Sequence, residues 1–511
     1  MKILTAAQVK AWDHFTIQNE PISSIALMER AAAACVKWIL THYPSTHQFS
    51  IFCGKGNNGG DGLAIARMLA ERGKLIQVHV LEFGFRGTDD FQTNLSRLHQ
   101  YPQVQIQFIQ SIEHIHPVPP ERLVIDALFG VGLHRELNGL AASVVNSINQ
   151  ANLEVVSIDL PSGLFADQSS PFPNIIKATH TLTLECIKPA LLFQENESYV
   201  GQLTVIPIGL HPEFLVNEMA SYEWVDSNFI RPLVNPRKRT AHKGNFGHAL
   251  LIAGSEGKMG AATLSARATL RAGVGLLTCQ VPKGGNTIMQ VAVPEAMTIS
   301  DKEEKFISML PKDLSAFNAI GIGPGIGQEV ATKEVLVSLI KQYRRPLVFD
   351  ADALNIISGD PSLLNSIPAG SILTPHLKEF ERLFGPSPSD YERMSTARDW
   401  AEKLQIIIII KGSNSMIFNI DRRVYFNSTG NPGMATGGTG DVLTGLITSL
   451  LAQGYPSLQA ALLGVYLHGK AGDLAAAEIS QEALMAGDII DFMGSAWKSL
   501  SIDQSHTNTI I

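Results

Sequence analysis

The stretch Asn431–Asp441 combines four glycines with an aspartate placed just before an apolar segment. Glycine lets a backbone approach a ligand closely because it has no Cβ. Residues 442–451 are apolar at helical spacing, so we expect a helix whose free N–H groups face the glycine loop. This arrangement predicts phosphoryl-transfer chemistry, with Asp441 as the base for a substrate hydroxyl. The alternative is that Asp441 only complements the helix dipole, which is worth about 0.3–1 kcal/mol.

A second glycine-rich stretch, Gly54–Gly62, lies between an apolar strand expected at residues 49–53 and a helix expected at residues 63–72. A strand, glycine loop and helix in this order place a ligand at the carboxyl edge of a parallel sheet. The dinucleotide-binding spacing is not met as such, because two asparagines crowd the turn. The stretch therefore indicates a ligand site, with a purely structural turn as the alternative.

Two further expected strands in this half end in acidic residues, Asp126 and Asp159, and Ser162 follows the second. The carboxyl ends of parallel strands share one edge, so these side chains are expected to meet the glycine loop there. The oxygen atoms of Asn58, Asp126 and Ser162 would suit a hard cation. Taken singly, each residue is more simply explained as the end of a strand.

In the second half, successive strands end in glycine, carboxylate or basic groups. In an open α/β sheet such groups share one crevice, so they should meet in space. Individually, His376 is explained as a hydrogen-bonded turn residue, Asp350 as a helix cap and Lys411 as an edge charge. The stretches concerned are Gly321–Gly327, Asp350–Asn355, Thr374–Glu379 and Lys411–Ser415.

Strands and helices alternate through both halves, which predicts α/β architecture with mostly parallel sheets. The alternation lapses between about residues 207 and 240, where prolines accumulate, so we place a domain boundary there. The expected domains are residues 1–215 and 235–511. The basic triplet 237–239 is interpreted as a solvated linker.

The composition of the chain argues against some classes of partner and location. The chain has 511 residues, 45% of them hydrophobic, and a formal net charge of −7, which argues against nucleic acid or an anionic membrane as a partner. Four cysteines without paired spacing predict reduced core residues. Neither a signal peptide nor an apolar run of about 20 residues is found. We expect a cytoplasmic protein that does not associate with membranes.

With Asp126–Gly130 and Asp159–Gly163, the Gly54–Gly62 stretch resembles the NAD(P)H-hydrate epimerase family over about residues 1–210. The resemblance implies a Rossmann-like sheet and a potassium ion held by Asn58, Asp126 and Ser162. It also implies that Asp159 contacts the substrate and serves as acid or base. The substrate-binding residues it implies are Asn57, Asn58, Gly59, Gly60, Asp61, Gly130, Val131, Gly132, Leu133, His134, Arg135, Glu136 and Asp159.

The stretches of the second half, with His242-Lys243-Gly244, resemble the ribokinase-like superfamily and, more closely, ADP/ATP-dependent NAD(P)H-hydrate dehydratases over about residues 235–495. The resemblance implies a catalytic base at Asp441 and binding of the hydrate by Gly325, His376 and Asp441. The nucleotide-binding residues it implies are Lys411, Gly412, Ser413, Asn414, Ser415, Asn431, Gly437, Gly438, Thr439 and Gly440.

Together the resemblances imply a bifunctional enzyme that repairs NADHX and NADPHX, the hydrated forms of NADH and NADPH. The first domain would interconvert the R and S epimers with K⁺, and the second would dehydrate the S epimer with Mg²⁺ and either ADP or ATP. We also expect a homo-oligomer. Two alternatives stay open: a small-molecule kinase with a nucleotide-binding regulatory domain, and an RNA-associated scaffold in the first half.

Overall fold

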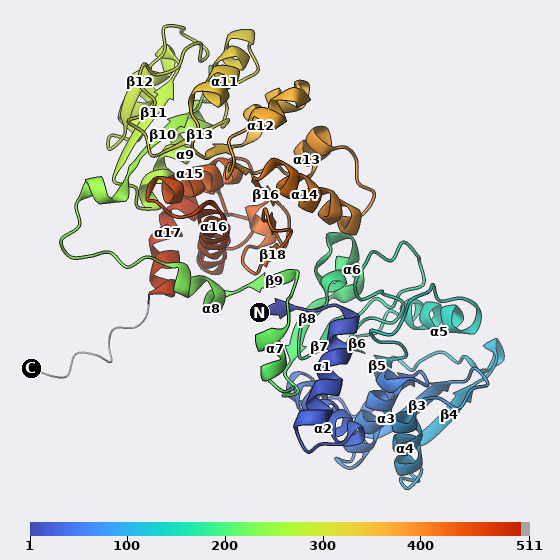
Figure 1. Ribbon diagram of the computed structural model, residues 1–511. Helices are drawn as coiled ribbons and strands as arrows, with labels where there is room; N and C mark the ends of the chain where they lie inside the picture. The colour runs from blue at the N-terminus through green and yellow to red at the C-terminus, as the bar shows by residue number, and fades with distance from the viewer. Residues whose placement is uncertain (502–511) are drawn as a thin grey trace, which may run out of the picture. The chain divides into compact units, whose positions relative to one another are not determined.

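The structure is a computed structural model that describes residues 1–501, and it divides into two compact units (Figure 1). The N-terminal unit consists mainly of residues 2–222 and the C-terminal unit mainly of the described residues from 223 onward. The division falls inside the proline-rich stretch between residues 207 and 240, where the strand–helix alternation was expected to lapse. The expected second domain extends to residue 511, and its last ten residues lie outside the described part.

The N-terminal unit is built on one parallel sheet in the order β4-β3-β2-β5-β6-β7-β8. Its elements are β1 (Lys2–Ile3), α1 (Ala6–Asn19), α2 (Ser24–His42), β2 (Gln48–Cys53), α3 (Asn57–Ala70), β3 (Leu75–Leu81), α4 (Asp89–Leu98), β4 (Gln105–Ile109), β5 (Leu123–Ala127), α5 (Gly139–Gln150), β6 (Val155–Ile158), β7 (His180–Leu184), α6 (Glu197–Val200), β8 (Gln202–Ile206) and α7 (Glu213–Asn217).

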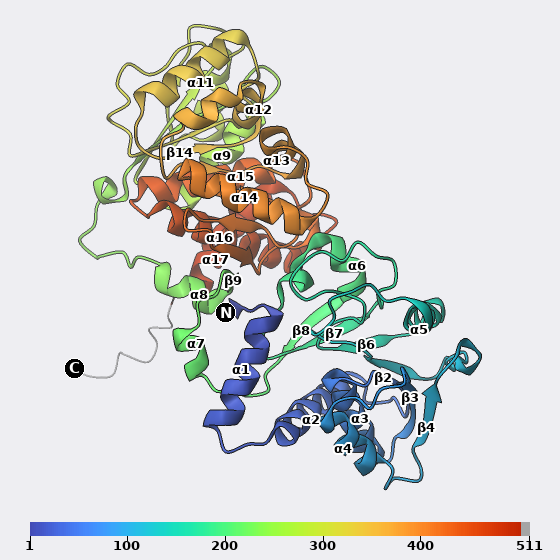
Figure 2. The same cartoon turned by 45° about the vertical axis from the view of Figure 1, so that its right-hand side comes forward.

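The strand order of this sheet reverses between β2 and β5. From β2 the chain passes through α3 and α4 towards β4, and from β5 it passes through α5 towards β6. Because such crossovers are right-handed, α3 and α4 cover one face and α5 covers the other (Figures 1 and 2). The point of reversal is the position at which open α/β sheets bind ligands.

Helix α3 begins earlier than the sequence predicted. We expected a loop through Gly62 and a helix from residue 63, but α3 already begins at Asn57, with Gly56 as its N-cap. Close packing explains the difference: a Cβ at Gly59 would lie 1.7 Å from the Gly54 carbonyl oxygen, and one at Gly60 would lie 2.8 Å from Met28 Sδ. These glycines let the first turn of the helix press against its neighbours.

In the C-terminal unit the sheet order is β18-β17-β16-β15-β14-β13-β10-β11-β12, with β9 beside β18. The elements are β9 (Tyr222–Val225), α8 (Ser227–Ile230), β10 (His248–Ile252), α9 (Met259–Arg271), β11 (Leu276–Val281), α10 (Asn286–Ala292), β12 (Met297–Ser300), β13 (Ala319–Ile322), α11 (Val330–Gln342), β14 (Leu347–Phe349), α12 (Ala351–Gly359), β15 (Ile372–Leu373), α13 (Leu377–Phe384), α14 (Asp390–Leu404), β16 (Ile407–Ile410), β17 (Met416–Phe418), β18 (Val424–Asn427), α15 (Thr439–Ala452), α16 (Ser457–Ile479) and α17 (Ala486–Leu500).

Strands β10 to β16 pair in parallel, as expected, whereas β17 and β18 extend the sheet in antiparallel register. The strand order reverses between β10 and β13, so α9 lies on one face, and α11 and α12 lie on the other. Helices α15, α16 and α17 pack on the α9 side (Figures 1 and 2). The parallel strands therefore bring their carboxyl ends to one edge.

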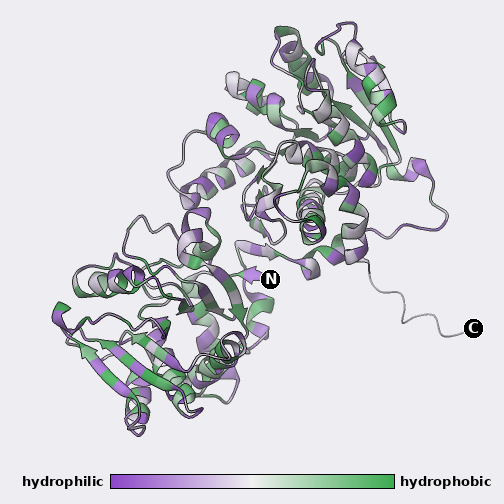
Figure 3. Ribbon diagram, turned by 180° about the vertical axis from the view of Figure 1, so that it is seen from behind, coloured by the Kyte–Doolittle hydropathy of each residue, from purple (hydrophilic) through white to green (hydrophobic). Residues whose placement is uncertain are grey.

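Hydrophobic residues concentrate on the strands and on the helix faces turned towards them in each unit (Figure 3). The isoleucine run at residues 406–410 contains β16, whose four residues are all buried between β15 and β17. The four cysteines are free and buried. Among the described residues, none of the helices combines the length and apolar character needed to cross a membrane.

Candidate functional sites

The N-terminal unit contains a cavity of about 1270 Å³, lined by the residues that follow β2 and β5 and by side chains of α1 and α2. Its position matches the reversal of strand order, where the sequence predicted a ligand site. The lining includes Asn57, Asn58, Asp61 and Asp159 of the predicted set, together with the loop Gly130–Arg135. A large cavity with a few converging polar groups is the usual form of a small-molecule site.

Three predicted substrate residues do not line this cavity: Gly59, Gly60 and Glu136. Gly59 and Gly60 lie in the first turn of α3, where they pack against Gly54 and Met28. They shape the site by allowing α3 to begin close to β2. Three other residues of the same helix line the cavity: Asn57, Asn58 and Asp61.

Asp159 is the most constrained acidic residue of the cavity. It follows β6 with φ of +68°, a left-handed conformation that is uncommon outside glycine. Its Oδ1 accepts a hydrogen bond from Lys188 Nζ at 2.5 Å, and that ammonium also donates to Thr183 Oγ1 and the Leu184 carbonyl. Thr183 and Leu184 hold the lysine amine in place, and the amine in turn fixes Oδ1 of Asp159.

Sequence reasoning missed Lys188, whose side chain is fully buried. Burial is the largest single effect on the pKa of Lys188 and lowers it, but the charges of Asp159, Cys186 and Asp13 and the hydrogen bond to Asp159 together outweigh it, so the net pKa lies above the ordinary value. The buried ammonium therefore keeps its charge beside Asp159. The available signal was a lysine four residues after the end of β7, but nothing in its spacing connects it with Asp159.

The three predicted cation ligands are placed differently from one another. Ser162 and Asp126 bond to each other, because Ser162 Oγ donates to Asp126 Oδ1 at 2.6 Å and Ser162 N donates to Oδ2 at 2.9 Å. Ser157 Oγ and Leu128 N complete the carboxylate's partners. Asn58 is different: both polar atoms of its buried amide lack a hydrogen-bond partner among the described residues.

This donor set partly fits a monovalent cation. A Cβ at Gly130 would lie 3.3 Å from Asn58 Cβ and 3.5 Å from Asp159 Oδ2, so Asn58 faces the centre of the site. Its amide oxygen is therefore available as a ligand. Burial raises the pKa of Asp126 despite its hydrogen bonds, and a nearby cation would offset that cost.

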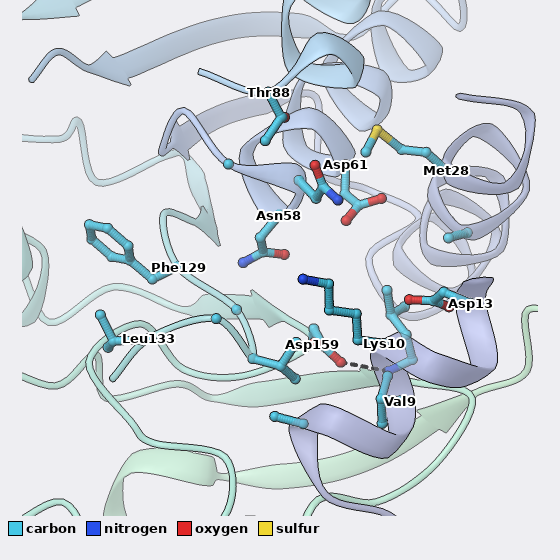
Figure 4. Close-up of a pocket in the computed structure, with 18 of the residues that line it drawn as sticks. Val9, Lys10, Asp13, Met28, Asn58, Asp61, Thr88, Phe129, Leu133 and Asp159 are labelled. Carbon is cyan, nitrogen blue, oxygen red and sulfur yellow. Dashed lines mark hydrogen bonds between the residues drawn. The ribbon is translucent and has the colours of Figure 1, made fainter. Parts of the chain in front are cut away.

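Helix α1 contributes two charged residues that sequence reasoning did not select, Lys10 and Asp13. Figure 4 shows the Lys10 amine reaching into the space between Asn58, Asp61 and Asp159, with Asp13 on the same helix. Their spacing of three residues puts them on one helix face, a pattern that was readable in the sequence. Only the fold shows that this face covers the cavity.

In the C-terminal unit the predicted glycine loop does open a helix. Gly438 is the N-cap of α15 in a left-handed conformation, with φ of +91°. Val442 N donates to the Gly438 carbonyl, so the N–H groups of Thr439, Gly440 and Asp441 precede the first intrahelical bond. They form an anion-binding helix terminus, with Asp441 in its first turn.

Asp350 lies beside this terminus at the end of β14. Its Oδ1 accepts a hydrogen bond from Lys411 Nζ at 2.9 Å, and its Oδ2 accepts one from Thr444 Oγ1 at 2.7 Å. Asp350 is the N-cap residue of α12, but its side chain makes no capping hydrogen bond. Asp350 therefore caps the helix through its backbone only, and its carboxylate joins β14, β16 and α15.

Asp441 lies close enough to Asp350 and Lys411 for both charges to change its pKa. Burial raises the pKa of Asp441 to about 7, the charge of Asp350 adds to the rise, and Lys411 opposes it. A carboxylate with a pKa near neutrality suits a general base. A Cβ at Gly440 would lie 3.3 Å from Lys411 Nζ, which places the helix terminus against the same charges.

His376 and Gly325 reach the same edge of the sheet. His376 pairs with Lys411 in an isolated parallel bridge, and its Nδ1 accepts hydrogen bonds from the backbone N–H groups of Lys378 and Glu379 as the N-cap of α13. Burial lowers the pKa of His376, Lys411 lowers it further, and Glu379 opposes them. Gly325 has φ of +63°, and its carbonyl accepts a hydrogen bond from Ser255 Oγ.

Several predicted nucleotide residues have structural partners. Lys411 is paired with Asp350, and Gly412 and Ser415 bond to each other across the turn before β17, which also contains Ser413 and Asn414. Asn431 donates to Asp473 and accepts from the backbone of Gly433. Asn431 therefore fixes the shape of the glycine loop. Gly437 has open space where a Cβ would point, so it leaves room for a ligand.

Fold and sites together define a two-site α/β protein whose C-terminal unit has the architecture of a phosphoryl-transfer enzyme. A solved ribokinase-like superfamily protein from Enterococcus faecalis resembles that unit, with a TM-score of 0.51 and 26% identity over 56% of this chain and 98% of its own. Two family models match: "NAD(P)H-hydrate dehydratase" at residues 249–493 and "YjeF-related protein N-terminus" at residues 24–190.

Relatives match along nearly the whole chain. A bifunctional NAD(P)H-hydrate repair enzyme from Moorella thermoacetica is 37% identical over 98% of this chain and 97% of its own. A protein of the same description from Coxiella burnetii is 32% identical over 94% and 96%. The chain belongs to the family of bifunctional NAD(P)H-hydrate repair enzymes.

Proposed function

We propose that this chain repairs hydrated NADH and NADPH in two steps, one in each unit. The N-terminal unit, within residues 1–215, interconverts the R and S epimers of the hydrate. The C-terminal unit, from residue 235 onward, dehydrates the S epimer with ADP or ATP as phosphoryl donor. Family membership and the presence of a separate polar site at the strand edge of each unit support this assignment.

The position of Asp441 carries the proposal for the dehydratase. Its carboxylate, with a pKa near 7, takes the proton of the C6 hydroxyl as that oxygen attacks the terminal phosphoryl group. The free N–H groups at the start of α15 stabilise the charge on the transferring phosphoryl group. Phosphate is a good leaving group at C6: the C6–O bond breaks with its electron pair on phosphate, a proton leaves C5, and the C5–C6 double bond that forms restores the dihydropyridine ring.

Four segments at this edge would hold the two ligands. Gly325 and His376 lie where the hydrate is expected, and the turn at residues 411–415 and the loop at 431–440 lie where the adenine nucleotide is expected. Among the described residues no group of three or more acidic, histidine or cysteine side chains is arranged for a metal. We expect Mg²⁺ to be bound by the nucleotide phosphates, where it would neutralise charge on the transferring group.

In the N-terminal unit, Asp159 is the residue expected to act on the substrate as acid or base. Its hydrogen bond from Lys188 holds Oδ1 and leaves Oδ2 facing Gly130 and the cavity. Asn57, Asn58, Asp61 and the loop 130–135 surround the hydrated ring. We further propose that K⁺ binds at Asn58 beside Asp126 and Ser162, where it would orient the substrate's polar groups.

The test is to incubate the purified full chain with each separated epimer of NADHX and of NADPHX, with and without Mg²⁺ and ADP or ATP. We expect interconversion of epimers without nucleotide, and recovery of reduced-nicotinamide absorbance with release of free phosphate when nucleotide is present. A small-molecule kinase would instead accumulate a stable phosphorylated product. The choice between ADP and ATP follows from the relative kcat/KM values.

The buried free cysteines and the composition are consistent with a cytoplasmic location, which we propose for the chain. Assembly into a homo-oligomer stays a prediction. RNA binding by residues 1–215 is not favoured, because the acidic cavity residues Asp61 and Asp159 would repel a phosphate backbone.

A further inference from the structure

Helix α1 places Asp13 in the wall of the N-terminal cavity. The helix is fixed at its start by the Thr5–Gln8 capping box and by Asp167, whose Oδ1 accepts a hydrogen bond from Ala6 N. Its buried face, including Trp12, packs into the core of the unit, while Asp13 lines the cavity. The position of Asp13 is therefore set by a well-anchored helix.

The carboxylate of Asp13 has neither a hydrogen-bond partner nor an ion-pair partner among the described residues. Burial raises the pKa of Asp13 to about 6; Asp159 and Glu185 add to the rise, and Lys188 opposes it. The other charged or titratable groups lining the cavity are Lys10, His14, Lys55, Asp61, His134, Arg135 and Asp167. Asp13 is thus an uncommitted carboxyl group in a partly desolvated cavity, next to the residue assigned to the substrate.

Asp13 and Asp159 differ in their partners. Asp159 Oδ1 accepts a hydrogen bond from the buried Lys188 amine at 2.5 Å, whereas the carboxyl group of Asp13 has no ion-pair partner among the described residues and burial raises its pKa to about 6. A carboxyl group paired with a cation and one without such a partner can divide the roles of base and acid between them. They belong to different elements, since Asp13 comes from α1 and Asp159 from the end of β6.

Epimerisation at C6 requires the hydroxyl to leave one face of the ring and return on the other. C6 carries both this hydroxyl and the ring nitrogen N1, whose lone pair can form an N1=C6 double bond when the C6–O bond breaks. One group must protonate the leaving oxygen, and another must accept a proton from the water that attacks the opposite face. A single carboxylate on one side cannot serve both faces.

We propose that Asp13 is the second acid–base residue of the epimerase, paired with Asp159 across the hydrated ring. Asp13 donates its proton to the C6 hydroxyl, the C6–O bond breaks with its electron pair on oxygen, and water leaves. A second water then attacks C6 from the side of Asp159, the N1=C6 electrons return to N1, and Asp159 takes the released proton. Exchange of one proton with solvent restores both residues.

This inference rests on the proposed epimerase function. Experiments on the full-length chain can distinguish a failure of the Asp13 assignment from a failure of the epimerase function. Wild type is compared with Asp13→Asn, with Asp13→Glu, and with Asp89→Asn as a matched control on α4, outside the cavity. The rate of epimer interconversion is measured from pH 5 to 9 after subtraction of the spontaneous rate. The dehydratase activity of each preparation and its melting temperature report whether the variant is folded.

We expect Asp13→Asn to lower kcat for epimerisation by about 100-fold or more, with little change in KM. The fall of the wild-type rate above pH about 6, which reports the protonated Asp13, should disappear in this variant. Asp13→Glu should restore activity to within about tenfold of wild type, and Asp89→Asn should behave as wild type. In ¹⁸O-labelled water each wild-type turnover should introduce one ¹⁸O at C6.

A kcat of Asp13→Asn within twofold of wild type would overturn the proposal, as would a loss confined to KM with the pH profile unchanged. Epimerisation without ¹⁸O uptake would also overturn it, because the C6–O bond would then have stayed intact. Failure of wild type to interconvert the epimers is a different result, since it would reject the epimerase function itself.

Discussion

Lys411 Nζ lies 2.9 Å from Asp350 Oδ1, and this ion pair joins the ends of β14 and β16 directly beside the first turn of α15. Neither residue is the base of the proposed reaction, yet both influence the ionisation of Asp441. Thr444, one turn further along α15, holds the second oxygen of Asp350. The helix terminus is therefore fixed relative to the sheet by one carboxylate.

The first prediction concerns the base. Asp441→Asn should lower kcat for nucleotide-dependent dehydration by about 10²–10⁴-fold and leave epimerisation unchanged, because only the C-terminal site loses its proton acceptor. Reappearance of reduced-nicotinamide absorbance measures the first activity, and separation of the epimers by chromatography measures the second. Unchanged dehydration in this variant would reject the assignment of Asp441.

The same substitution should affect stability in a pH-dependent way. Folding raises the pKa of Asp441 from the ordinary 3.8 to about 7, so ionisation above pH 4 costs the wild type stability, and the full cost is present above pH 7. Asp441→Asn should therefore melt at a higher temperature than wild type at pH 8, and the gap should close below pH 4. A gap that does not depend on pH would contradict the raised pKa.

The second prediction is the pH profile of dehydration. Because the base must be ionised, kcat should rise with pH through about 7 and then level off. Asp350→Asn removes a negative charge, so it should move this rise to lower pH, whereas Lys411→Met should move it to higher pH. Shifts in the same direction for both variants would show that the profile does not report Asp441.

The third prediction concerns the buried pair of the N-terminal unit. Lys188→Met leaves Asp159 without its cation in a desolvated position, which should cost about 3–5 kcal/mol of folding free energy and abolish epimerisation. The double variant Lys188→Met/Asp159→Leu should recover much of the stability but none of the activity. Urea unfolding measures the first quantity. A single variant as stable as wild type would show that the pair is not coupled.

The fourth prediction tests the cation site. K⁺ should stabilise the folded wild type more than Na⁺ does, by up to about 2.7 kcal/mol of folding free energy at a concentration 100 times Kd, which is measured as a higher melting temperature. Asn58→Leu should remove this K⁺-specific effect, because the unpartnered amide oxygen is lost. Asn138→Leu is a suitable control, since the side chain of that helix-capping residue makes no capping hydrogen bond. Equal responses of wild type and Asn58→Leu to K⁺ would remove Asn58 from the ligand set.

Most of the architecture was predictable from the sequence, because it depends on local patterns. Strand β2 contains the strand predicted at residues 49–53, and the apolar stretch at residues 442–451 lies in α15 as expected. The convergence of strand ends followed from the parallel α/β pattern alone, and the contacts of Asp350 with Lys411 and Thr444 bear it out. Such features need only residue periodicity and chain topology.

The parts that were missed depend on tertiary contacts. The early start of α3 is permitted because Gly59 fits against Gly54, a fit that helix propensity alone does not reveal. Lys188 reaches Asp159 from the segment after β7, and Asp13 reaches the cavity from α1, so both placements depend on how these elements pack. Conversely, Asn431 resembles a ligand contact in the sequence, yet the structure commits its side chain to Asp473.

At Gly440 a single substitution is expected to affect folding stability and catalytic turnover in different ways. It stands within a helix, where alanine is preferred over glycine by about 1 kcal/mol, so Gly440→Ala should be tolerated or even favoured by the fold. The added methyl group would nevertheless lie 3.3 Å from the Lys411 amine, inside the space assigned to the phosphoryl group. Variant screens that score expression or heat resistance would rate this substitution harmless, and only a turnover assay would expose the damage.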